Sequence, residues 1–290
     1  MEILFVGLPE SITIEFLAKK HGNEIAKLHA LREKYLANPT NPELVKDIEE
    51  IKSRLRDELN EEFRKYLKKR NLPVKIFDKT KPFHWALEFW YFYFDNNGDP
   101  LPENLRGVDV LIGNPPYERI QILNKKAPIY VKYLNNAGFE SAFKNYDLAV
   151  IFIERGFKLL KHNGEFGYIV THKFMQADYG EKLREFLSRG KYITQIVNFG
   201  DQQVFDDATT YTALLFLKKS ENKKFKYALI KKLQRSLDQL LQVKKLDTYD
   251  DENITIFTQS SESITKEPWV FALASEEELL EKLKTKTKLR

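Results

Sequence analysis

The feature that most constrains the fold is an alternation of helix and strand patterns along the middle of the chain. A helical pattern starting at Tyr146 (YDLAVIFIERGFKLLK, ended by HNG) precedes a strand (EFGYIVT), and a second helix (DYGEKLREFLSRG) precedes a second strand (YITQIVNFG). TTYTALLFLKK and FKYALIKKL are further strand patterns. Such alternation with short connections favours a largely parallel sheet flanked by helices, in which ligands bind at the carboxyl ends of the strands. We therefore predict an α/β protein with a partial Rossmann-like fold.

The stretch VDVLIGNPPYERI places four polar or rigid residues directly after an apolar strand. The strand pattern begins at Val108, is typical of a buried strand, and ends before Asn114, Pro115, Pro116 and Tyr117. Each proline fixes its own φ, lacks a backbone donor and restricts the residue before it. The sequence therefore predicts a rigid loop at the carboxyl end of a strand, where ligands of such sheets bind.

This loop offers hydrogen-bond acceptors without competing donors on the prolines. The Asn114 side-chain oxygen and the Pro115 carbonyl can each accept one hydrogen of a primary amine, and Tyr117 can lie against a planar ring that carries the amine. Two fixed acceptors would favour the geometry in which the nitrogen lone pair attacks an electrophilic methyl group. From the residues alone, Asn114 could also be a turn former and Tyr117 a cap on the strand end.

The NPPY motif and its surroundings resemble the adenine-N6 DNA methyltransferases of the gamma arrangement, in the methylase part of large fused restriction and modification enzymes. Six blocks carry the resemblance in order: FHWALEFWYFYF, GVDVLIGNPPY, NYDLAVIFIERGFKLLKHNGEFGYIVTHKF, DYGEKLREFL, VNFGDQQVFDDATTYTALLFLKK and TQSSESITKEPWVF. They cover roughly residues 71 to 274. The resemblance implies a methyltransferase fold, DNA as substrate and S-adenosyl-L-methionine as methyl donor.

The resemblance also implies roles for individual residues. Asn114 and Pro115 would accept the two N6 hydrogens of an adenine that has been flipped out of the duplex, and Tyr117 would stack on that base. Phe205, in the segment QVFDD, would stack on the other side of the base, and Phe152 would border the adenine moiety of the cofactor. Some relatives carry a basic residue where Ala208 stands here, so that contact is not expected.

The glycine-rich turn that approaches the cofactor in such enzymes is missing from the sequence. No GxG pattern occurs anywhere in the chain. We therefore expect the carboxyl-terminal part of a methylase domain, which needs an upstream cofactor-binding segment and a specificity domain or subunit as partners. A second hypothesis is a catalytically silent DNA-binding or assembly subunit, and a third is methylation of another amine, in RNA or on a protein glutamine.

The rest of the chain organises around this catalytic part. Apolar residues at three- and four-residue steps predict two helices in residues 1–70, divided at ANPTNPEL, where Thr40 or Asn41 can cap the second helix and Pro42 lies in its first turn. We expect a helical arm in residues 1–70, the catalytic part in 71–233, and an extension in 234–290 with a terminal helix at SEEELLEKLKTKTKLR. The aromatic-rich stretch 71–95 is expected to be core.

Composition limits the alternatives. The chain has 290 residues and no cysteine, which excludes disulfides, thiolate nucleophiles and cysteine-ligated zinc. Its five histidines show no paired metal-ligand spacing, so no metal site is expected. The net charge of +5 suits a polyanionic partner, and runs such as RKYLKKR are typical of solvated helix faces. No apolar run is long enough to cross a bilayer, so we expect a cytoplasmic protein.

Overall fold

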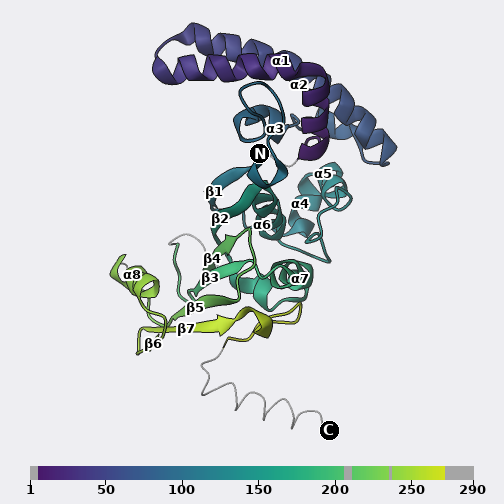
Figure 1. Cartoon of the computed structure of the whole chain (residues 1–290). Coiled ribbons are helices and arrows are strands. Elements are labelled where there is room, and N and C mark those ends of the chain that lie inside the picture. Colours follow the sequence, from purple (N-terminus) through teal and green to yellow (C-terminus); the bar gives the residue numbers. More distant parts are fainter. Residues whose placement is uncertain (1–5, 206–210, 235–236, 272–290) are drawn as a thin grey trace. The chain divides into compact units, whose positions relative to one another are not determined.

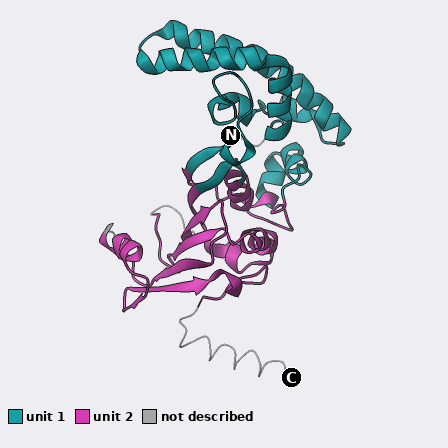
Figure 2. Ribbon diagram, in the orientation of Figure 1, with its two compact units in different colours: residues 1–110, 121–139, 158–164 teal, residues 111–120, 140–157, 165–290 magenta. Residues whose placement is uncertain are grey.

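The computed structural model describes residues 6–205, 211–234 and 237–271, and these residues form two compact units (Figure 1, Figure 2). Unit 1 comprises residues 1–110, 121–139 and 158–164, and unit 2 comprises residues 111–120, 140–157 and 165–290. The helix predicted at the carboxyl terminus lies outside the described residues. The predicted functional boundaries at residues 71 and 234 stay a prediction, because compact packing alone does not mark them.

Unit 1 is built on the helical hairpin that the sequence predicts. α1 (Glu10–Ala37) and α2 (Pro42–Lys69) pack against each other, and Asn41 accepts a hydrogen bond from the Glu43 N–H (3.0 Å) at the start of α2. This confirms the predicted cap. One face of α2 is buried at four-residue steps, as its period predicts, through Ile51, Leu55, Leu59, Phe63 and Leu67.

Shorter elements complete unit 1. The aromatic-rich stretch, which was expected to be core, is buried only in part, since several of its aromatic residues are half-buried: Phe77, Phe83, Trp85, Phe89, Tyr91 and Phe92. Leu87, Trp90, Tyr93 and Phe94 are buried. The elements are η1 (Val74–Asp78), α3 (Trp85–Glu88), η2 (Trp90–Phe92), η3 (Glu103–Leu105), α4 (Ile120–Lys126) and α5 (Pro128–Leu134). Among the described residues, every helix is too short or too polar to span a membrane.

A seven-stranded sheet with the order β1-β2-β4-β3-β5-β7-β6 dominates unit 2, and its first two strands begin in unit 1. The strands are β1 (Val108–Gly113), β2 (Leu160–Thr171), β3 (Ile193–Asn198), β4 (Thr212–Lys218), β5 (Lys224–Ile230), β6 (Tyr249–Asp250) and β7 (Ile254–Ser260). The helices and turns are α6 (Leu148–Leu159), η4 (His172–Met175), η5 (Asp178–Gly180), α7 (Glu181–Arg189), α8 (Leu237–Lys245) and η6 (Ser261–Ser263). The α/β class with a helix-flanked sheet is confirmed.

The strand directions differ from the largely parallel sheet that the sequence predicts. β3 and β5 are parallel, whereas β4 is antiparallel to both β2 and β3, and β7 is antiparallel to β5 and β6. No described residue between β3 and β4, or between β4 and β5, forms a helix. Parallel neighbours need a long crossover that usually contains a helix, so short connections favour the antiparallel arrangement. The helix α6 also ends at Leu159 and passes directly into β2, so HNG lies within that strand and does not mark its start.

The strand β1 is at one end of the sheet and is not the buried strand that its apolar sequence predicts. Val110 is 62% exposed and Ile112 is 80% exposed. Within the described part of the chain, only β2 pairs with it. Burial fails here because, among the described residues, little packs against the face to which Val110 and Ile112 point.

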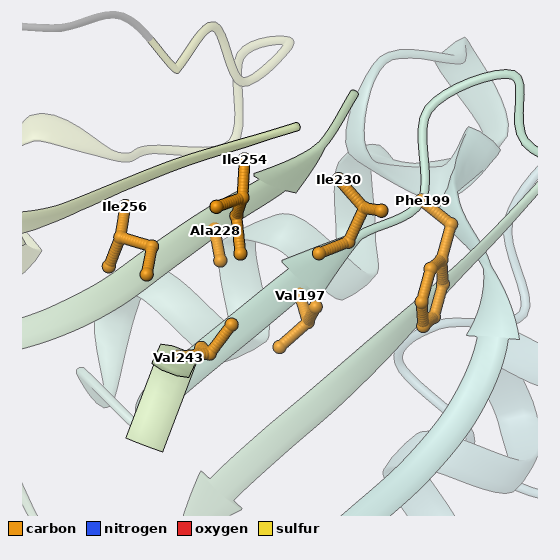
Figure 3. Packing of buried hydrophobic residues seen from close by; sticks show 7 residues of the cluster. All are labelled: Val197, Phe199, Ala228, Ile230, Val243, Ile254 and Ile256. Atoms are coloured by element: carbon orange, nitrogen blue, oxygen red, sulfur yellow. The ribbon is translucent and has the colours of Figure 1, made fainter. Parts of the chain in front are cut away.

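The buried core of the sheet lies away from β1, around β3, β5 and β7. On one face, Val197 and Phe199, Ala228 and Ile230, and Ile254 and Ile256 project from β3, β5 and β7 or their ends toward Val243 of α8 (Figure 3). Alternate residues of each strand point to the opposite face, which carries Tyr227. The core therefore fixes β3, β5 and β7 as a rigid platform, while β1 carries the predicted loop at its exposed end.

Candidate active site

The NPPY loop follows β1 directly and lies wholly in unit 2. Asn114 and Pro116 are exposed, Pro115 is buried and Tyr117 is half-buried. Among the described residues, no donor bonds to the Asn114 side-chain oxygen or to the Pro115 carbonyl. The two acceptors therefore have no hydrogen-bond donor among the described residues.

The side chain of Tyr117 is fixed to the neighbouring strand. Its hydroxyl donates a hydrogen bond to the Ile169 carbonyl of β2 (3.1 Å). At the end of β1, a side chain at Gly113 would lie 2.9 Å from the ring of Tyr168, so this position requires a residue without one. The hydrogen bond of Tyr117 and the close approach of β1 at Gly113 together hold the loop against β2.

Backbone hydrogen bonds join the outgoing arm of the loop to the segment that enters α6. The Ile120 N–H donates to the Tyr146 carbonyl and the Leu148 N–H donates to the Glu118 carbonyl, each over 2.9 Å. Arg119 and Asp147 form the bridge between these two pairs. The loop is thus anchored on both sides of Asn114 by regular backbone pairing.

Asp147 places a carboxylate beside this loop. It accepts a hydrogen bond from the Ala149 N–H (3.0 Å) at the start of α6. Burial raises the pKa of Asp147 from 3.8 to about 6, although the Ala149 N–H, Arg119 and Lys173 act in the opposite direction. A carboxyl group with this pKa changes charge just below neutral pH.

The charge of Asp147 affects the pKa of two tyrosines. Burial, and then the negative charge of Asp147, raise the pKa of Tyr117 to about 12. Burial and Asp147 also raise the pKa of Tyr179, while Arg119 and Arg184 oppose the shift. Both phenols are therefore neutral at physiological pH and can act as hydrogen-bond donors.

The other two predicted site residues with described positions are in the same unit as the loop. Phe152 is half-buried on α6, and Phe205 is half-buried in the segment after β3. Phe205 has no ring contact with Tyr117 among the described residues. Ala208 lies outside the described residues. The roles of Phe152 and Phe205 remain predictions.

A second group of polar side chains lies at the ends of β2 and β3. The His172 Nδ1 is 2.9 Å from the Asn198 Oδ1, and the Asn198 Nδ2 donates to the Tyr227 hydroxyl (3.0 Å). They line a pocket of about 150 Å³ together with Met175, Gln176, Trp269, Val270 and Phe271. β2 and β3 run in the same direction, because each is antiparallel to β4. His172 follows β2 and Asn198 ends β3, so these two side chains lie at the carboxyl-terminal ends of both strands.

Arg184 of α7 supports the turns beside this pocket. Its guanidinium is buried and donates to the carbonyls of Phe174 and Ala177 (2.7 Å each) and of Lys266 (2.8 Å). One cation therefore satisfies three loop carbonyls, which holds η4 and the segment leading to Trp269 in place. Within the described ranges, no group of three or more histidine, aspartate or glutamate side chains could hold a metal ion.

Sequence reasoning missed Asp147, Lys173 and Tyr179 as neighbours of the loop. Asp147 lies in the run from Tyr146 that the sequence assigns to a helix, and no local pattern links this run to the NPPY loop. The signal that could have pointed to Asp147 is a charged residue directly before the apolar run LAVIFI.

Comparison with known proteins decides the family. The profile of the Eco57I restriction-modification methylase family matches residues 18–205, well over half of the chain. The chain belongs to this family. The matched range includes the NPPY loop, Asp147, Phe152 and Phe205, and it extends into the helical hairpin.

Individual Eco57I-type relatives are much longer than this chain. The chain is 35% identical over 162 residues to the type II restriction enzyme and methyltransferase RM.Eco57I of Escherichia coli, which covers 56% of this chain and 15% of that protein. It is 28% identical over 186 residues to the type II methyltransferase M.BstVI of Geobacillus stearothermophilus, covering 61% of this chain and 32% of that protein. The chain thus spans less than a third of the length of these relatives.

Similarity to solved structures is weaker. The type IIG restriction endonuclease BpuSI aligns with a TM-score of 0.39 and 16% identity, covering 53% of this chain and 19% of that chain. A modification subunit of a putative type I restriction enzyme from Vibrio vulnificus aligns with a TM-score of 0.42 and 17% identity, covering 60% and 40%.

Proposed function

We propose that this chain supplies the catalytic part of an adenine-N6 DNA methyltransferase of a restriction-modification system, with S-adenosyl-L-methionine as methyl donor. The observation that carries the proposal is the NPPY loop, whose two acceptors at Asn114 and Pro115 bond to no described donor while its backbone is anchored on both sides. Membership of the restriction-modification methylase family supports the same reaction class. A DNA substrate also agrees with the predicted cytoplasmic location.

The loop would act on an adenine that has left the duplex. The Asn114 oxygen and the Pro115 carbonyl would accept the two N6 hydrogens, which directs the nitrogen lone pair away from the ring plane. Tyr117, held by the Ile169 carbonyl, would support one face of the base, and Phe205 would support the other. S-adenosyl-L-methionine supplies an electrophilic methyl group at a sulfonium sulfur. The described residues do not complete a site for it, because no GxG turn occurs and Asn114 is exposed.

A cofactor-binding segment would therefore be required beside β1. The strand has one unpaired edge among the described residues and exposes Val110 and Ile112. A segment that adds a strand at this edge would satisfy the free backbone groups, cover these side chains and form the second wall of the loop. We infer that this upstream methylase segment, and a specificity domain or subunit for target recognition, are partners of the chain.

Substitution of Asn114 tests the catalytic role. The chain would be combined with a GxG-bearing methylase segment encoded next to it, and methyl transfer to duplex DNA would be measured under single-turnover conditions. Asn114→Ala should lower the rate about 100-fold to 1,000-fold, the loss typical when a transition-state acceptor or donor is removed. A rate within tenfold of the original chain would contradict the proposal, provided that both proteins melt at the same temperature.

The second candidate is a catalytically silent DNA-binding or assembly subunit, favoured by the missing glycine-rich turn. Calorimetry with S-adenosyl-L-methionine separates the two: submillimolar binding to the isolated chain would count against the silent subunit. Methylation of an amine in RNA or on glutamine is the third. Nucleoside analysis that finds N6-methyladenine in DNA would exclude it.

A further inference from the structure

We propose that the end of α2 and the adjoining η1 form a surface that binds the phosphate backbone of duplex DNA without sequence preference. This basic surface consists of Lys68, Lys69, Arg70, Lys75, Lys79 and Lys81. The inference rests on the proposed function only in taking DNA as the partner. It assigns a contact to the helical part of the chain, whose role neither the NPPY loop nor the family match explains.

The segment that contains the basic surface is strongly positive. Residues 65–81 contain seven cationic residues and one acidic residue, a net charge of +6, whereas the whole chain carries +5. All six side chains of the basic surface are exposed. Residues 218–232 carry an equal net charge of +6. Several lysines of that second segment form ion pairs with described carboxylates, namely Lys218, Lys226, Lys231 and Lys232.

A packed scaffold joins the end of α2 to η1, which together carry most of these cations. Phe63 of α2 lies 5.4 Å from Phe77 of η1 between ring centroids, and the Arg64 guanidinium lies 3.9 Å over the Phe77 ring. Leu67 and Ile76 are buried beneath the cations. The end of α2 and η1 therefore form one fixed surface, so the charges are presented together and not on a loose tail.

The cations of the basic surface differ from those elsewhere on α2. Earlier in the helix, Lys52 pairs with Glu88 (2.6 Å) and Arg54 with Glu24 (3.3 Å). None of the six basic-surface residues forms an ion pair with a described residue. Interaction with the helix dipole explains cations in the last turn of α2, such as Lys68 and Lys69, but not those that follow in η1 and beyond it.

Duplex DNA suits this surface better than a membrane does. Clustered, unpaired lysines are point charges that match closely spaced phosphates and release condensed counterions on binding. A membrane-binding surface would also need an exposed apolar face beside the cations. Here Leu72 and Ile76 are buried, and Val74 and Phe77 are half-buried, so that apolar face is missing from the basic surface.

A matched pair of charge variants tests the proposal. The first carries Lys68→Gln, Lys69→Gln, Lys75→Gln and Lys79→Gln. The control carries Lys19→Gln, Lys20→Gln, Lys27→Gln and Lys34→Gln, which removes four exposed cations from α1 in the same unit. Binding to a fluorescein-labelled duplex of about 25 base pairs is measured by anisotropy from 50 to 300 mM KCl, a range over which phosphate contacts weaken steeply.

The basic-surface variant should lose at least tenfold in affinity at 100 mM KCl. Its slope of log affinity against log salt should fall by about 3, because each phosphate contact contributes roughly 0.9. The control should stay within threefold with an unchanged slope. Equal losses in both variants would overturn the proposal, as would tighter binding to single-stranded RNA or to phosphatidylserine vesicles than to the duplex.

The assay needs neither cofactor nor turnover, so its failure can be told apart from failure of the methyltransferase proposal. If Asn114→Ala abolishes methylation while the basic-surface variant binds DNA normally, only the basic surface is wrong. If the basic-surface variant loses DNA binding while no methyl transfer is found with any partner segment, only the catalytic proposal is wrong. Unchanged circular dichroism melting of both charge variants excludes unfolding as the cause.

Discussion

Replacing Asp147 by asparagine should stabilise the protein at neutral pH. The substitution preserves the shape of the side chain and the hydrogen bond from the Ala149 N–H, because asparagine caps helices as well as aspartate does. It removes only the charge. In the native chain that charge is costly, because burial raises the pKa of Asp147 to about 6 despite the favourable positions of Arg119 and Lys173.

The magnitude and sign follow from proton linkage. The pKa of Asp147 rises from 3.8 to about 6 on folding, so between these values the native state binds more protons than the unfolded state. The stabilisation from proton binding is complete below pH 3.8 and is lost as the pH rises through 6. At about 1.4 kcal/mol per pKa unit, the ionised carboxylate costs up to about 3 kcal/mol above pH 7, and solvent reaching this half-buried group reduces the figure.

Urea unfolding of both proteins at pH 4.5, 6 and 8 measures the effect. The difference in the free energy of unfolding between Asp147→Asn and the original chain should be about 1 to 3 kcal/mol at pH 8 and about one third of that value at pH 4.5. Taking the difference cancels the titration of groups that do not interact with Asp147. A difference that does not change with pH, or that favours aspartate at pH 8, would refute the reasoning.

Three further substitutions give sharp expectations. Tyr117→Phe removes the hydrogen bond to Ile169 and should cost about 1 kcal/mol of stability while methyl transfer falls less than tenfold, whereas Tyr117→Ala should lose far more activity in the same assay. Arg184→Ala leaves three loop carbonyls unsatisfied and should cost about 3 kcal/mol or more in urea unfolding, with Arg184→Lys recovering part of the loss. Burial lowers the pKa of His84 from 6.5 to about 4, so stability should fall by up to about 3 kcal/mol as the pH drops through this range, and His84→Gln should abolish that fall in melting curves.

Local patterns allowed the helices and the loop to be predicted. The buried row on α2 repeats every four residues and its first turn combines Asn41 with Pro42, so period, cap and proline indicate the same helix. The NPPY loop is equally local, because two prolines restrict the backbone whatever surrounds them. Even here a single apolar position can fail: Leu36, at the end of α1, is 54% exposed because the helix ends one residue later, at Ala37.

Strand direction and the surroundings of the loop could not be predicted, because both depend on pairing between distant segments. Whether β4 runs parallel or antiparallel to β3 depends on pairing between the two strands, and no local pattern encodes it. Asp147 reaches the neighbourhood of Tyr117 only because residues 118–120 pair with residues 146–148. The sequence between them gives no sign of that pairing.

The strand β1 shows most clearly where a local pattern stops being informative. Its apolar residues predict an interior strand, yet Val110 and Ile112 are exposed and the strand pairs on one side only among the described residues. An exposed apolar edge favours association with another strand, and the loop that offers the two acceptors begins at the end of this same edge. A polypeptide that pairs with β1 would therefore bury the edge and complete the wall facing Asn114 in one step. Ile112→Lys should block the binding of a cofactor-bearing segment and abolish methyl transfer, whereas Val45→Lys, at an exposed position on α2, should do neither. That result would show that assembly and catalysis are coupled through β1. Equal behaviour of the two variants would show that they are not.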